Sequence, residues 1–194
     1  MPSWFPLGMP DALHKEQLTS TTEAQARASF PVKMPAVNPG GFTLVALDHV
    51  WPPHVDEASR DGGVMADWSV ALYQDSAGHS LQIFQGFFAP MHSWAELDPP
   101  ADSVGALDIN GKSAVWVTAS PALGAMPQVV NDRLAISTWE KHTDFAYVGW
   151  QDEVYAAPQG GTGETSRYYG LASDFLSVAQ LAEIARSIQV VSGA

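Results

Sequence analysis

The chain contains no cysteine, and this absence excludes several kinds of site at once. Disulfide bonds, thiolate zinc sites, iron–sulfur clusters and cysteine nucleophiles all need this residue. The absence does not fix the compartment, because a chain of 194 residues can bury enough apolar surface to fold without disulfides. The compartment must therefore be inferred from other features.

Positive charge is also scarce. Nine Lys and Arg stand against 21 Asp and Glu, which gives a formal net charge of −12. A nucleic-acid partner requires a basic surface, so this class of partner is not expected. The sequence has no run of about 18 apolar residues, and we expect no direct membrane insertion of this segment. The partners that fit this composition are a small apolar ligand or another protein.

Patterns typical of β-strands fill the middle of the chain. Apolar and polar residues alternate along Trp68–Tyr73 and along Ser80–Gln85, which predicts a hairpin. Asn110-Gly111 lies between Val104–Ile109 and Ser113–Thr118. An Asn-Gly pair tolerates the positive φ angles of a type I′ turn, so these two segments form a second predicted hairpin.

Helical patterns lie towards the two ends. Ser177 and Gln180 have the spacing of a capping box, and the apolar residues after Ser177 repeat at helical spacing up to Ile188. Thr22 and Gln25 have the same spacing, which predicts a short helix ending before Pro31. Residues 11–18 are also compatible with a helix.

These elements predict one α+β fold, in which a curved antiparallel sheet is packed by the C-terminal helix and a short N-terminal helix. Residues 1–20 are interpreted as an N-terminal arm or linker. Residues 21–194 are interpreted as a single sensor-like domain.

Several segments together resemble a known family of bacterial domains. They are Phe30–Pro35, Pro39–Phe42, the Val70–Tyr73 and Ser80–Gln85 hairpin, Ile109–Lys112 and Leu176–Ile188. The chain resembles the uncharacterised extracytoplasmic C-terminal domain of anti-sigma-factor-like proteins and lipoprotein-type regulators, which is similar to the half-barrel folds of lipoprotein carriers. The resemblance implies an extracytoplasmic or periplasmic location, with a cytoplasmic one as the alternative. It also implies a binding or sensing role, and it carries over no catalytic residue.

Candidate catalytic and metal-binding residues are few. No nucleophile elbow, phosphate-binding loop or His-Glu-x-x-His motif is present. His49, His54 and Asp56 are weak candidates for a metal site, because their spacing matches no strong ligand pattern. They support an alternative function as a small metal-assisted hydrolase. The favoured interpretation assigns no catalytic residue, no metal and no other cofactor.

Aromatic residues are the better indication of a binding site. Phe87, Phe88, Met91 and Trp94 lie in a Pro-bounded loop, where an exposed cluster would mark a ligand or partner surface. The other predicted binding residues are Trp150 and Tyr168. We therefore expect a non-catalytic extracytoplasmic domain that binds a lipid-like, peptide-like or protein ligand. A structural module that docks through its aromatic loops is a further alternative.

Overall fold

The computed structural model describes residues 14–28, 30–36, 38–51, 67–86, 95–122, 125, 128–130, 133–156 and 164–190. Within these residues, strands predominate and two α-helices are present. The helices are α1 (Thr21–Arg27) and α3 (Val178–Ser187), with a 3-10 turn η2 (Ala101–Ser103). The strands are β1 (His14–Gln17), β2 (Lys33–Pro35), β3 (Thr43–Trp51), β4 (Trp68–Gln74), β5 (Ser80–Gly86), β6 (Val104–Ile109), β7 (Lys112–Val117), β8 (Ala119–Pro121), β9 (Gln128–Val130), β10 (Arg133–Ala135), β11 (Trp139–Lys141), β12 (Ala146–Ala156), β13 (Glu164–Ser173) and β14 (Ile188–Val190).

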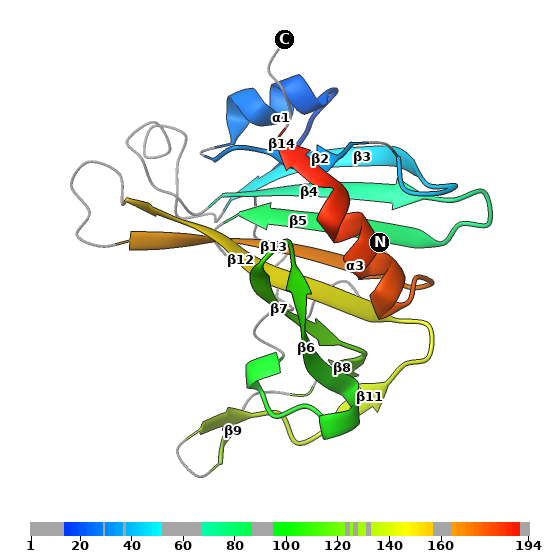
Figure 1. Cartoon of the computed structure of the whole chain (residues 1–194), viewed down its shortest axis with the longest axis vertical. Helices are drawn as coiled ribbons and strands as arrows, with labels where there is room; N and C mark the ends of the chain where they lie inside the picture. Colours follow the sequence, from blue (N-terminus) through cyan, green and yellow to red (C-terminus); the bar gives the residue numbers. More distant parts are fainter. Residues whose placement is uncertain are drawn as a thin grey trace.

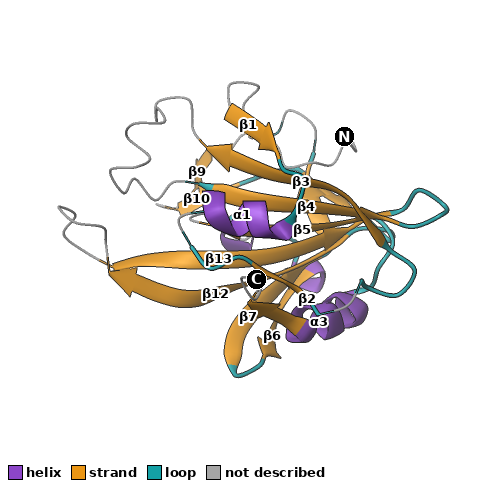
Figure 2. Ribbon diagram, turned by 90° about the horizontal axis from the view of Figure 1, so that it is seen from above, coloured by secondary structure: helices purple, strands orange, loops and turns teal. Residues whose placement is uncertain are grey.

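The main sheet has eight strands in the order β1-β3-β4-β5-β13-β12-β7-β6. Every neighbouring pair in it is antiparallel. Figure 1 shows α3 crossing one face of this sheet, and Figure 2 shows how its long strands curve. The predicted fold class, a curved antiparallel sheet packed by helices, is confirmed.

The pleat of the sheet separates two apolar clusters. Val148 of β12 lies in the larger cluster, together with Ala24 of α1 and Leu181 of α3. The next residue towards the N-terminus, Tyr147, lies in the smaller cluster with Phe84. Because successive side chains of a strand point to opposite faces, both helices cover the same face of the sheet. We call this face the helix face.

The two predicted hairpins are present. β4 pairs with β5, and β6 pairs with β7. Asn110 and Gly111 have φ angles of 54° and 83°, as a type I′ turn requires. The predicted capping box of α3 is also present, because the Ser177 hydroxyl accepts from the backbone of Gln180 and the Gln180 side chain accepts from the backbone of Ser177.

The start of α1 differs from the prediction. Ser20, not Thr22, is the N-cap, and its hydroxyl accepts a hydrogen bond from the Glu23 amide at 3.1 Å. Glu23 in turn accepts from the amide and hydroxyl of Thr19. The helix ends at Arg27, before Pro31 as predicted. A proline would have allowed the helix to run a few residues further. Local spacing therefore identified the helix but not its first residue, since several Ser and Thr residues compete for the cap.

The predicted helical stretch within residues 11–18 is wrong for the part that the structure describes. His14–Gln17 forms β1, which pairs with β3 at the edge of the main sheet. Lys15 forms an ion pair with Asp48 at 2.8 Å, and the Leu18 amide donates to Leu47. Backbone hydrogen bonds to an existing strand edge here override a weak local helix preference.

A small sheet joins β2 to the last strand of the described chain. β14 follows α3 directly and pairs antiparallel with β2, with Ile188 opposite Pro35 and Val190 opposite Lys33. Two further pairs, β8 with β11 and β9 with β10, lie outside the main sheet. Neither helix in the described part of the chain has the length and apolar character needed to cross a membrane.

Candidate functional site

A pocket of about 190 Å³ lies where α3 ends, on the helix face of the sheet. It combines two lysines, a carboxylate and an amide with an apolar wall. Its lining residues are Lys33, Ile109, Asn110, Lys112, Trp150, Asp152, Ala185 and Ile188. We call it the α3 pocket. It brings together β2, the β6–β7 hairpin, β12 and the end of α3, so its walls come from four separate segments.

One wall of the α3 pocket is fixed by reciprocal contacts between the β6–β7 turn and α3. The Asn110 side-chain amide donates to the Arg186 carbonyl at 3.0 Å, and the Arg186 guanidinium donates to the Asp108 carbonyl at 3.0 Å. The Asp108 carboxylate also accepts from the Gly111 amide. The turn therefore satisfies one of the carbonyls that the end of a helix leaves without an intrahelical partner.

Asp152 lies at the centre of the polar side of the pocket. Asp152 lies in an irregular part of β12, because the pairing of β12 with β13 shifts register between Gln151 and Val154. A bulge of this kind interrupts the ladder and re-aims side chains. The Asp152 carbonyl accepts from Lys112 Nζ at 2.8 Å, and the Asp152 carboxylate forms ion pairs with both Lys112 and Lys33.

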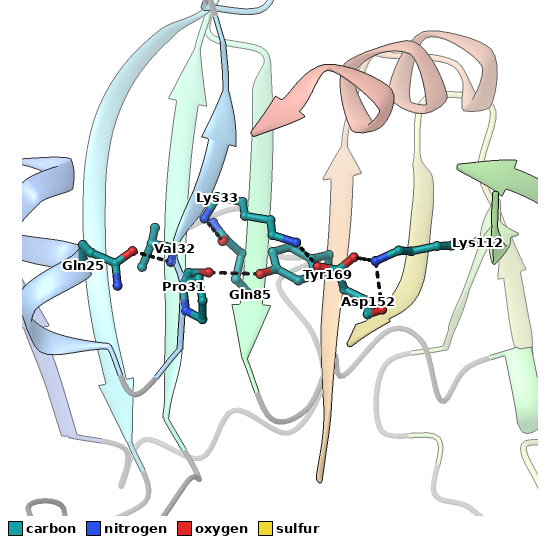
Figure 3. A network of polar contacts seen from close by, with 8 residues as sticks. All are labelled: Gln25, Pro31, Val32, Lys33, Gln85, Lys112, Asp152 and Tyr169. Carbon is teal, nitrogen blue, oxygen red and sulfur yellow. Dashed lines mark hydrogen bonds and ion pairs between the residues drawn. The ribbon is translucent and has the colours of Figure 1, made fainter. Parts of the chain in front are cut away.

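The Lys33–Asp152–Lys112 triad is shown in Figure 3, where the two lysines approach the carboxylate from opposite sides. The Asp152 side chain is only 6% exposed, whereas Lys33 is 16% and Lys112 is 34% exposed. A buried carboxylate is unfavourable unless it is paired and hydrogen-bonded, and the triad supplies both. The two lysines are partly exposed, whereas the carboxylate with which they pair is buried.

Lys33 is itself held by the residues around it (Figure 3). Its backbone amide donates to Gln85 Oε1 at 2.7 Å, and its ammonium lies 5.2 Å from the centre of the Tyr169 ring. Tyr169 stacks on Trp150 with ring centres 5.6 Å apart, and its hydroxyl donates to the Pro31 carbonyl at 3.1 Å. These contacts give the pocket a pre-formed wall in which an aromatic pair supports an ammonium group.

The segment before Lys33 is anchored to α1 in the same network. The Gln25 side chain accepts from the Val32 amide at 2.8 Å and donates to the Phe30 carbonyl at 3.2 Å. Gln25 thus uses both ends of its amide to hold a stretch of backbone that has no strand partner. The predicted capping role of this glutamine is replaced by a role in fixing the entry to β2.

Of the predicted binding residues, the structure describes only Trp150 and Tyr168, and these two lie on opposite faces of the sheet. Trp150 is 4% exposed and lines the α3 pocket. Tyr168 pairs with Gln151 rather than with Trp150, so its half-buried side chain lies on the opposite face of the sheet. The structure does not bring these two residues into one surface. The other predicted binding residues, Phe87, Phe88, Met91 and Trp94, lie outside the described residues.

Of the three weak metal candidates, the structure describes only His49. His49 is 1% exposed, and its Nε2 lies 3.1 Å from the carboxylate of Asp67, which is equally buried. His54 and Asp56 lie outside the described residues. No group of three or more His, Asp or Glu residues in the described ranges could hold a metal ion. The His49–Asp67 pair is buried, and it joins β3 to the residue that precedes β4.

Comparison of the chain with protein-family models, with curated proteins and with solved structures finds no match. The function must therefore be argued from the geometry of the site itself.

Sequence reasoning missed most of the polar residues of the α3 pocket. It named Trp150, but not Lys33, Lys112 or Asp152. One signal was available, because Asp152 lies two residues after the apolar strand run that ends at Trp150, where a carboxylate is buried only with a partner. With nine Lys and Arg in the chain, the candidates for that partner were few.

Proposed function

We propose that this protein is a non-catalytic binding domain and that its ligand is a small molecule held in the α3 pocket. The observation that carries this proposal is the convergence of Lys33, Lys112 and Asp152 on a cavity walled by Trp150 and Ile109. Binding sites for small molecules are concave and largely apolar, with a few placed polar groups that orient the ligand. The α3 pocket is concave and holds such polar groups, but only half of its lining residues are apolar, so it suits a ligand with a polar part.

The volume of the pocket limits the size of the ligand. At about 190 Å³, it is smaller than the roughly 300–1,000 Å³ typical of sites for drug-sized molecules. A lipid chain of full length exceeds it, whereas a short apolar group with one polar head fits. Of the ligand classes that the sequence indicates, the pocket therefore favours a small molecule or the end of a peptide.

A sensing role is compatible with the position of the pocket. Lys33 belongs to β2 and Ile188 begins β14, and these two strands pair with each other. A ligand that contacts both stabilises the folded state by mass action and strengthens the closure of the domain at β2 and β14. An extracytoplasmic location and a role in envelope sensing, which the resemblance implies, are part of this proposal.

The experiment is a ligand screen observed on the protein by NMR. Mixtures of small neutral and charged molecules are added to ¹⁵N-labelled protein, and the amides of Ile109, Asn110 and Ala185 report on the α3 pocket. The amide of Val45, an exposed residue of β3, is the internal reference. We expect shifts that concentrate at the pocket amides.

A matched pair of variants separates the pocket from the rest of α3. Ala185 lines the pocket, whereas Ala179 is exposed on the same helix. Ala185→Leu should reduce binding by filling the cavity, and Ala179→Leu should leave it unchanged. A screen in which no compound shifts the pocket amides, or in which both variants bind equally, contradicts the proposed function.

A further inference from the structure

We infer that Asn110 is a site of spontaneous deamidation, and that this modification releases the β6–β7 turn from the end of α3. The inference concerns one wall of the α3 pocket and does not depend on the ligand. It starts from the sequence, in which Gly111 follows Asn110. Because glycine has no Cβ atom, its backbone nitrogen is accessible to the side-chain carbonyl carbon of the asparagine before it.

The reaction consumes one water molecule and releases one ammonia molecule. The Gly111 nitrogen gives its proton to a base in the solvent and forms a bond to Cγ of Asn110. The bond between Cγ and Nδ2 then breaks, Nδ2 takes up a proton and leaves as ammonia, and a succinimide ring remains. Water opens this ring at either of its two carbonyl carbons. One opening gives aspartate, and the other gives iso-aspartate, whose backbone passes through the former side chain.

The other two asparagines of the chain are poor sites for this reaction. Asn38 precedes a proline, whose nitrogen carries no proton and cannot close the ring. Asn131 precedes an aspartate, whose side chain crowds the backbone nitrogen. Asn110 is exposed, and it also lines the α3 pocket. The sequence therefore concentrates this chemistry at one wall of the pocket.

In the closed turn, both reacting groups are held apart. The Gly111 amide donates to the Asp108 carboxylate, and the Asn110 side-chain amide donates to the Arg186 carbonyl, both at 3.0 Å. Asn110 has a φ of 54°, as in a type I′ turn, whose first central residue has a ψ of about 30°. At this ψ the Gly111 nitrogen points away from the Asn110 side chain, so the ring can close only after the turn has opened.

The contacts that keep the turn closed come from α3. Besides the bond from Asn110 to the Arg186 carbonyl, the Arg186 guanidinium donates to the Asp108 carbonyl. Both hydrogen bonds are exposed, and breaking them leaves the strand pairs of the main sheet in place. Local openings of this kind cost less free energy than global unfolding. The rate of deamidation in the folded protein therefore reports how often the turn leaves α3.

The product cannot restore these contacts. A carboxylate at position 110 has no proton to donate to the Arg186 carbonyl, and it faces the negative end of the helix. If the Arg186 guanidinium turns to the new carboxylate, it gives up its bond to the Asp108 carbonyl, so one contact is lost in either case. Asp-Gly still suits a type I′ turn, whereas iso-aspartate lengthens the backbone of the turn. Both products therefore separate the hairpin from α3 without reversal.

The first experiment measures where and how fast the modification occurs. The full chain is incubated at mildly alkaline pH, both folded and unfolded in guanidinium chloride, and peptide mapping by mass spectrometry follows the conversion of each asparagine. We expect conversion at Asn110 in both samples, with a lower rate in the folded protein. Asn38 should stay unmodified, because it precedes a proline.

Paired variants attribute the rate to the contact with α3. Arg186→Gln removes the guanidinium that holds the turn, and it should raise the rate in the folded protein by about fivefold, as the loss of one hydrogen bond implies. Lys141→Gln removes a cation that pairs with Asp102 on the exposed surface, and it should leave the rate unchanged. If Arg186→Gln disturbs the fold, the folded and unfolded samples of the unmodified protein still test the inference.

The second experiment tests the consequence with a variant that has the sequence of one product. Asn110→Asp should speed hydrogen exchange of the Ile188 amide, which donates to the Ala185 carbonyl at the end of α3. Asn38→Asp adds the same charge at another exposed asparagine and should leave this exchange unchanged. Hydrogen exchange followed by NMR compares the two variants with the unmodified protein.

Three results would overturn the inference. If Asn110 stays unmodified in the folded protein, it is not a deamidation site. If Arg186→Gln folds and leaves the rate unchanged, or if the folded and unfolded samples react equally fast, the contact with α3 does not protect the turn. If Asn110→Asp leaves the exchange of the Ile188 amide unchanged, the modification does not release the turn. The proposed function stands or falls separately, by the ligand screen.

Discussion

The ammonium group of Lys33 forms an ion pair with the carboxylate of Asp152, which lies 119 positions away in the chain. This pair connects the short strand β2 to the centre of the long strand β12, and Lys112 completes it from the neighbouring hairpin. The polar side of the α3 pocket and the closure of the domain at β2 thus depend on the same carboxylate.

Replacing Asp152 by Asn should destabilise the protein by about 2 kcal/mol. Removing one partner of a buried ion pair costs roughly 3–5 kcal/mol, and the partial exposure of Lys33 and Lys112 reduces this cost. Asp102→Asn is the matched control, since its pair with Lys141 is exposed to solvent and should contribute little to stability. Urea unfolding measures both. Equal losses would show that burial of the triad contributes nothing.

The position of the α1 cap is tested by two substitutions two residues apart. Ser20→Ala should lower the free energy of unfolding by about 1 kcal/mol, because the Ser20 hydroxyl accepts from the Glu23 amide. Thr22 lies inside the helix and is exposed, so Thr22→Ala should change stability by less than about 0.5 kcal/mol. If Thr22→Ala caused the larger loss of stability, Thr22 rather than Ser20 would be the N-cap.

Gly149 of β12 allows the ring of Tyr147 to lie flat against the sheet. A Cβ atom at this glycine would come within 2.0 Å of the Tyr147 hydroxyl oxygen. Gly149→Ala should therefore cost about 3 kcal/mol or more, since both residues lie in packed interior. Gly40→Ala is the control, because nothing lies within 4 Å of a Cβ there. Thermal unfolding should show a marked loss for the first variant alone.

Stability should fall at alkaline pH because of two buried tyrosines. Burial raises the pKa of Tyr73 to about 12, and complete burial raises the pKa of Tyr147 further. Between pH 10 and 12 the unfolded chain has lost these protons while the folded protein keeps them. Each group then lowers the free energy of unfolding by about 1.4 kcal/mol per pH unit.

The Tyr73→Phe variant tests this pH dependence. Its unfolding is measured by urea at pH 8 and at pH 11, and the measurement at pH 8 accounts for any change in packing. The variant should lose less stability between the two pH values than the unmodified protein. An identical loss in both proteins would mean that Tyr73 ionises equally in the folded and unfolded states.

Sequence patterns predicted the elements better than their partners. The Asn110-Gly111 turn and the capping box of α3 depend on residues within three or four positions of each other, and both are present. The site was predicted less well. Trp150 lines the α3 pocket, but Tyr168 lies on the other face, because their order along β12 and β13 does not reveal the register between these strands.

The sequence by itself determined the antiparallel α+β class, its hairpins and the amphipathic face of α3. Turn preferences and the hydrophobic periods of strands and helices depend on residues only a few positions apart, so they can be recognised without the tertiary structure. Only the tertiary structure decided that His14–Gln17 adds an edge strand and that β14 closes onto β2. It also decided that Lys33 and Lys112 meet at Asp152. These contacts join distant segments, and their energy comes from hydrogen bonds and charges that become neighbours only after the sheet has formed.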